Sequence, residues 1–131
     1  MAERLTFLAG RRLVNVAGES HYQEALQALT GSDGGAPVRR EFQAVLAPEP
    51  DNRHDPNAVR VLIADQHVGY LPREDARAYG AMLEGLAERG RRGTCEAMVS
   101  GRGGGASNIG VFLRLPEPEE GAADPDVARR W

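Results

Sequence analysis

Short stretches in which hydrophobic and polar residues alternate recur along most of the chain. A period of two is typical of β-strands that bury one face, because successive side chains of a strand point to opposite sides. The pattern predicts strands over residues 11–18, 38–48, 58–64, 67–71, 94–101 and 109–115. Asp65 and Gln66 separate the third of these strands from the fourth, and we expect them to form a two-residue hairpin turn.

Two other segments follow the period of an α-helix. The first is expected to begin at Ser20, which has the spacing of a capping box with Gln23, and to end at Gly31. The second begins at Pro72 and ends before Gly90. Its apolar stripe consists of Ala76, Tyr79, Met82, Leu83 and Leu86.

The order and number of these elements indicate the fold class. A parallel α/β fold needs a helix at almost every crossover between strands, and this chain has two helices among at least five strands. The pattern therefore predicts a mainly β fold with two helices, of the α+β class. Its expected form is a small antiparallel β-barrel or strongly bent sheet, plugged by a helix.

Length and charge divide the chain. Its 131 residues fit one domain, and the stretch from Pro116 to Trp131 carries the whole net charge of −3, with five acidic residues and two arginines. Because the rest is neutral, any binding to nucleic acid has to be local. We expect an N-terminal extension over residues 1–10, a folded unit over residues 11–115, and an acidic flexible tail over residues 116–131.

Several classes of site lack the residues they need. A single cysteine, Cys95, excludes an internal disulfide and a zinc site built from several thiolates. The three histidines have no metal-site spacing, and no nucleophile motif surrounds a serine. We therefore expect no cofactor, no metal and no enzymatic activity. The chain has no stretch typical of a signal peptide or membrane span, which predicts a cytoplasmic protein without a membrane partner.

The segment over residues 47–61 concentrates prolines and hydrogen-bonding side chains. Pro50 and Pro56 stiffen it, and its polar residues include Asp55 and Asn57. Two interpretations remain open. The Asp and Asn side chains cap the backbone of a turn, or they form the polar lip of a binding site.

Three segments resemble the signatures of the HIRAN domain family. They are GESHYQEAL at 18–26, PEPDNRHDPNAVRV at 48–61 and HVGYLPREDA at 67–76, and the resemblance runs in order over residues 11–115. The family occurs at the N-terminus of some SWI/SNF-type helicases and as free-standing bacterial proteins, and this chain is similar to the latter. The resemblance implies an OB-like barrel with a helix. It also implies binding to the 3′ end of single-stranded DNA, as in eukaryotic members.

The resemblance assigns roles to individual residues. Asp55 matches the aspartate that receives the terminal 3′-hydroxyl, and a carboxylate suits this role because it only accepts hydrogen bonds and repels a phosphate. His21 and His54 stand where DNA-binding members have stacking tyrosines, which implies weaker stacking. Ser20 replaces an arginine that holds phosphate. The expected DNA-binding residues are His21, Tyr22, Arg53, His54, Asp55, Asn57, Tyr70, Arg73 and Arg102.

These expectations describe a non-catalytic module for single-stranded DNA 3′ ends in DNA repair or replication-fork processing, with helicases or nucleases as protein partners. The alternative is a protein-interaction or ligand-sensing module that kept the barrel and lost strong DNA contacts. The replaced tyrosines and the neutral folded unit favour this alternative. A binding comparison between free and phosphorylated 3′ ends separates the two, because only the first predicts a difference.

Overall fold

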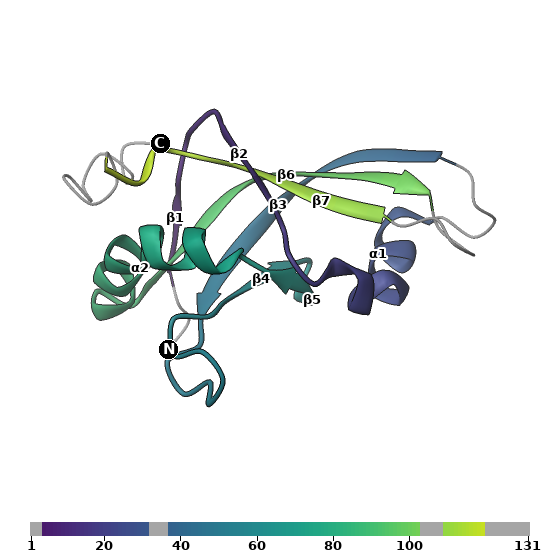
Figure 1. Ribbon diagram of the computed structural model, residues 1–131. Helices are drawn as coiled ribbons and strands as arrows, with labels where there is room; N and C mark the ends of the chain where they lie inside the picture. The colour runs from purple at the N-terminus through teal and green to yellow at the C-terminus, as the bar shows by residue number, and fades with distance from the viewer. Residues whose placement is uncertain (1–3, 32–36, 103–108, 120–131) are drawn as a thin grey trace.

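The computed structural model describes residues 4–31, 37–102 and 109–119, in which seven strands form one sheet accompanied by two α-helices (Figure 1). The strands are β1 (Arg4–Phe7), β2 (Arg12–Asn15), β3 (Pro37–Pro48), β4 (Val59–Ile63), β5 (Gln66–Tyr70), β6 (Arg91–Arg102) and β7 (Ile109–Leu115). The helices are α1 (Gln23–Thr30), which follows a short 3-10 helix η1 (Glu19–Tyr22), and α2 (Arg73–Glu88). The prediction of a mainly β fold with two helices is confirmed.

The sheet curls until its two edges meet. Its strand order is β2-β7-β6-β3-β4-β5, and every pair along this path is antiparallel. Ala17, just beyond β2, donates its N–H to the Tyr70 carbonyl at 2.7 Å, and Tyr70 donates to the Ala17 carbonyl at 2.9 Å. This pair joins the first strand of the path to the last, as the predicted OB-like barrel requires.

One hydrophobic core fills the barrel. Alternate residues of β4 and β7 are buried, as the period of two predicts. The stripe predicted for α2 is also buried and belongs to the same cluster as the strand residues. Because α2 packs against β6 and β3, it acts as the expected plug.

Two predictions about local structure are wrong: the capping box of Ser20 with Gln23, and the position of the hairpin turn. No side-chain hydrogen bond caps η1 or α1. The Gln23 amide bonds the backbone of Ile109, donating to its carbonyl at 2.9 Å and accepting its N–H at 2.8 Å, and it also donates to the Glu19 carbonyl at 3.0 Å. The hairpin turn between β4 and β5 lies at Ala64 and Asp65, one residue earlier than predicted. Both have positive φ angles, 50° and 64°, which match the right-handed twist of the flanking strands.

The fold extends beyond the boundaries expected for it. β1 pairs in parallel with the first residues of β6, and Leu8 is fully buried, so residues 4–8 are part of the sheet rather than an extension before it. Four residues are too few for their periodicity to predict a strand. At the other end, Pro116 is buried. Residues 120–131, which make up most of the predicted flexible tail, lie outside the described residues.

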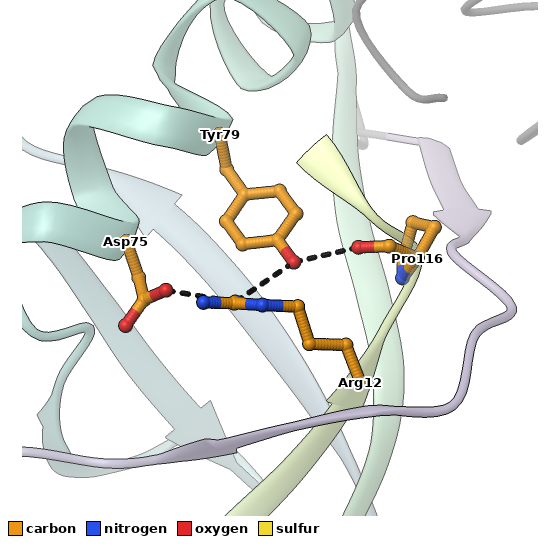
Figure 2. Close-up of polar contacts among 4 residues, drawn as sticks. All are labelled: Arg12, Asp75, Tyr79 and Pro116. Carbon is orange, nitrogen blue, oxygen red and sulfur yellow. Dashed lines mark hydrogen bonds and ion pairs between the residues drawn. The ribbon is translucent and has the colours of Figure 1, made fainter. Parts of the chain in front are cut away.

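A polar network holds Pro116 against α2 (Figure 2). The buried Tyr79 hydroxyl donates to the Pro116 carbonyl at 2.6 Å and accepts a hydrogen bond from Arg12 Nη1 at 3.1 Å. The same Arg12 nitrogen forms an ion pair with Asp75 Oδ1 at 2.8 Å. Burial raises the pKa of Tyr79, so the hydroxyl keeps its proton and remains a donor. The network ties β2, α2 and the end of β7 together.

A chain that ends at Leu115 is expected to unfold more easily than one that ends at Glu119. Loss of the Pro116 carbonyl leaves a buried hydroxyl without its acceptor, at a cost of about 1–3 kcal/mol. The melting temperature should fall by roughly 4–8 °C for each kcal/mol. Thermal unfolding of the two truncated chains beside the full chain measures this difference. Equal melting temperatures for the two truncations would contradict the structural role of Pro116.

Candidate functional site

A groove of about 350 Å³ opens where the two edges of the sheet meet. Its walls come from three segments that are far apart in sequence: the end of the β2 segment, the loop between β3 and β4, and the connection from β5 to α2. These are the same segments that carry the three sequence motifs. The lining residues are Ala17, Gly18, Asn52, His54, Asp55, Ala58, Tyr70, Leu71 and Arg73. Four predicted site residues therefore lie together: His54, Asp55, Tyr70 and Arg73.

Gly69 allows the first segment to approach β5. Its φ angle is 151°, a conformation that residues with a Cβ rarely adopt. A Cβ at this position would collide with Val16 Cγ1 and lie 2.7 Å from the Ala17 carbonyl oxygen. Gly18 then turns the chain into η1 with a left-handed φ of 75°. These two glycines place the 17–22 segment beside Tyr70.

The loop between β3 and β4 is stiffened by its own polar side chains. Asn52 Oδ1 accepts the N–H groups of His54 at 2.9 Å and Asp55 at 3.0 Å, and Asn52 Nδ2 donates to Glu49 Oε1 at 3.1 Å. Asp55 Oδ1 accepts the N–H of Asn57 at 3.0 Å. The first interpretation of this segment is therefore confirmed, because its side chains cap the backbone. The capped loop also forms a wall of the groove, and its role as the lip of a binding site stays a prediction.

Asp55 and Arg73 give the groove both charges. The second carboxylate oxygen of Asp55, Oδ2, has no hydrogen-bond partner within the described ranges. It can accept a hydrogen bond from a hydroxyl group and repels a phosphate. Arg73 is exposed at the start of α2, where its guanidinium can bind a phosphate oxygen. The groove thus suits a ligand that carries a free hydroxyl and a phosphate.

Three aromatic rings form a row that begins in the groove. The His67 ring lies between Tyr22 and Tyr70, with centroid distances of 4.4 Å to Tyr22 and 4.8 Å to Tyr70. His67 Nε2 is 2.9 Å from the carbonyl oxygen of Gly69, which fixes the ring on β5. We call Tyr22, His67 and Tyr70 the aromatic row. Both tyrosines are among the predicted site residues and His67 is not, because its contact with Tyr22 joins segments far apart in the sequence.

The surroundings of His67 and Tyr70 favour the neutral forms of both rings. Burial lowers the pKa of His67, and the charge of Arg60 lowers it further, whereas the hydrogen bond to Gly69 and the charge of Glu49 oppose these effects without cancelling them. Burial raises the pKa of Tyr70, and the charge of Glu49 and a hydrogen bond to it act in the same direction. Glu49 is in turn paired with Arg60 at 3.2 Å. At neutral pH His67 and Tyr70 are therefore uncharged.

Acidification is expected to destabilise the wild-type protein more than the His67→Phe variant. The pKa of His67 in the folded state lies below its ordinary value of 6.5, so the unfolded chain binds more protons between these two values. This contribution to stability is complete above the unfolded pKa and is lost as the pH falls through the folded pKa. Urea unfolding of both proteins at about pH 7.5 and about pH 5 measures this loss of stability. The same pH dependence in both proteins would contradict this assignment.

The remaining predicted site residues lie outside the groove. His21 is exposed on η1, where its N–H donates to the Gly18 carbonyl at 3.0 Å, and Arg53 is exposed in the loop before β4. Asn57 lines a larger groove of about 550 Å³ between this loop and α2. The backbone of Arg102 pairs with Pro37, at the opposite end of β3 from the loop, and its side chain is not among those described.

Three further findings concern other kinds of site. Within residues 4–31, 37–102 and 109–119, no three His, Cys, Asp or Glu side chains are placed to hold a metal ion. In the same part of the chain, no helix is long and apolar enough to cross a membrane. Cys95 is buried, and burial raises its pKa to about 12, so it is not a thiolate at neutral pH.

A mainly antiparallel sheet that curls into a small barrel, with a groove where its two edges meet, defines the class of small β-barrel modules. The model of the HIRAN domain family matches residues 10–104, and the chain belongs to this family of DNA-binding domains. The crystal structure of the HIRAN domain of human HLTF is similar to this chain, with a TM-score of 0.45 and 21% identity over 94% of this chain and 89% of that one. No curated protein matches the sequence.

Proposed function

We propose that the groove binds the 3′ end of single-stranded DNA. The observation that carries this proposal is the position of Asp55, whose Oδ2 faces no partner within the described ranges while Oδ1 and Asn52 fix its loop. A hydroxyl on a terminal sugar can donate to Oδ2. Arg73 lines the same groove and suits the phosphate that precedes the terminal nucleotide.

Aromatic residues of the groove suit the base of the terminal nucleotide. Tyr70 and His54 both line it, and a base with an exposed face can stack on either ring. In a duplex the terminal base is held by its pairing partner and by stacking on the next base pair, so an unpaired end, whose base is free to turn toward the ring, is the better ligand. We propose that the module binds without catalysis and acts in DNA repair or replication-fork processing beside helicases or nucleases.

The test compares short single strands that differ only at the 3′ end. Fluorescence anisotropy should show binding to a free 3′-hydroxyl that is at least about 10-fold tighter than to a 3′-phosphate, because the phosphate meets the Asp55 carboxylate. A circular single strand should bind as poorly as the phosphorylated one. Equal affinity for all three strands would overturn the proposal and favour the protein-interaction alternative.

Affinity is expected to fall with salt at a slope of about −0.7 for each phosphate contact, or roughly −1.4 to −2.8 for two to four contacts. Arg39, Arg53 and Arg73 are exposed, and Arg102 is a further candidate by sequence. Arg73→Gln should reduce the slope by about 0.7. Arg114→Gln, on the exposed side of β7, is the matched control and should leave it unchanged. A flat salt response would exclude phosphate neutralisation as the source of affinity.

A further inference from the structure

The aromatic row extends from the groove toward η1. Tyr70 lines the groove, whereas Tyr22 and His67 lie beyond its lining. All three side chains are partly exposed, and none of them belongs to the buried hydrophobic cluster that fills the barrel. The row is therefore part of the surface next to the groove, and packing of the core does not require three aromatic rings here.

We propose that the aromatic row is a second subsite, which stacks bases upstream of the 3′-terminal nucleotide. This inference rests on the proposed function, because it assumes that the terminal nucleotide occupies the groove. The DNA strand would then leave the groove past Tyr70 and follow the aromatic row toward Tyr22. His67 is the central residue of this subsite, and the expected DNA-binding residues did not include it.

The geometry of the rings leaves faces available for stacking. The planes of the His67 and Tyr70 rings meet at 76°, so the edge of one ring points at the face of the other. In such a T-shaped pair, the faces of the edge-on ring are not used in the contact. The Tyr22 ring is tilted by 37° to His67. Each of the three residues stays partly exposed, so the row is not enclosed by the rest of the protein.

Electrostatics favour a base over a phosphate at this subsite. Burial and the charge of Arg60 disfavour the protonated form of His67, and its lowered pKa keeps the ring neutral. Glu49 interacts with Tyr70 and forms an ion pair with Arg60, so the charge of Arg60 is already paired. A phosphate here would meet a carboxylate and no free cation among these groups, whereas an uncharged base meets only aromatic surface.

An abasic scan of the ligand tests the subsite. Single abasic residues are placed at each position in turn from the 3′ end of an oligonucleotide with a free 3′-hydroxyl. In the wild type, an abasic residue at one or more internal positions near this end should weaken binding about 5- to 100-fold. His67→Ala should lose this sensitivity to internal positions and keep its preference for a free 3′-hydroxyl over a 3′-phosphate.

Two further variants serve as controls. His67→Phe keeps an aromatic ring between the two tyrosines and should retain the sensitivity to internal abasic residues. Gln66→Ala changes an exposed neighbour in β5 and should behave as wild type. If His67→Ala does not fold, Tyr22→Ala at the outer end of the row replaces it and should show the same loss.

The outcomes separate this inference from the proposed function. A wild type that prefers the free 3′-hydroxyl but tolerates abasic residues at every internal position would overturn the subsite alone. Unchanged sensitivity in folded His67→Ala or Tyr22→Ala would do the same. A wild type without any preference for the free 3′-hydroxyl would instead remove the proposed function on which the subsite depends.

Discussion

The Gly69→Ala variant is expected to lose about 2–4 kcal/mol of its free energy of unfolding, because both the backbone and the packing at this position require glycine. The φ angle is 151°, and a Cβ would collide with Val16 Cγ1 and lie 2.7 Å from the Ala17 carbonyl oxygen. Relief of this collision moves residues 16–18 away from β5. The backbone pair between Ala17 and Tyr70 then breaks, and the groove loses the wall that contains Gly18.

Urea unfolding and DNA binding, measured on the same preparation, test both parts of this prediction. Gly85→Ala is the matched control, because Gly85 lies in α2 and a Cβ there meets nothing within 4 Å. Alanine is the better helix former, so this variant should gain about 0.5–1 kcal/mol and bind normally. Wild-type stability in Gly69→Ala would show that the edges of the sheet do not depend on this close approach.

Asp55→Ala is expected to weaken binding to a free 3′ end by about 10- to 150-fold, because a hydrogen bond to a charged group contributes roughly 1.5–3 kcal/mol. A strand with a 3′-phosphate should bind weakly to the wild type and lose little more in the variant. The substitution also removes the acceptor for the Asn57 N–H, at a cost of about 1 kcal/mol in stability.

Asp55→Asn separates the two roles of this carboxylate. The amide oxygen can still accept the Asn57 N–H, so stability should remain within about 0.5 kcal/mol of the wild type. The negative charge is lost, and the preference for a free 3′-hydroxyl over a 3′-phosphate should shrink. An unchanged preference in Asp55→Asn, or an equal loss on both ligands in folded Asp55→Ala, would show that Asp55 only caps its loop.

Elements with a clear local period were predicted well. The inward face of β3 shows this: Ala44 and Leu46 are buried and Phe42 packs against the core, as alternation predicts. The helices follow the same logic, and α1 and α2 are each followed by a glycine with positive φ, Gly31 and Gly90. Such signals need no knowledge of distant residues.

The predictions that failed depend on partners far along the chain. Gln23 has the spacing of a capping residue, but its amide bonds Ile109, and no local pattern distinguishes the two outcomes. β1 is stabilised by pairing with β6 rather than by its own four residues. Propensity and spacing describe local preferences, and tertiary contacts override them where the energies are similar.

The same distinction applies to the candidate site. The residue types of the 48–61 and 67–76 motifs are sufficient to recognise the family and to select Asp55 and Arg73 as candidates. Which of the other candidates join them depends on closure of the barrel through Ala17 and Tyr70. Closure places His67 beside Tyr22, and the turn of the loop directs Asn57 to the groove along α2. Burial and neighbouring charges set the pKa of His67, and both exist only once distant segments have packed together.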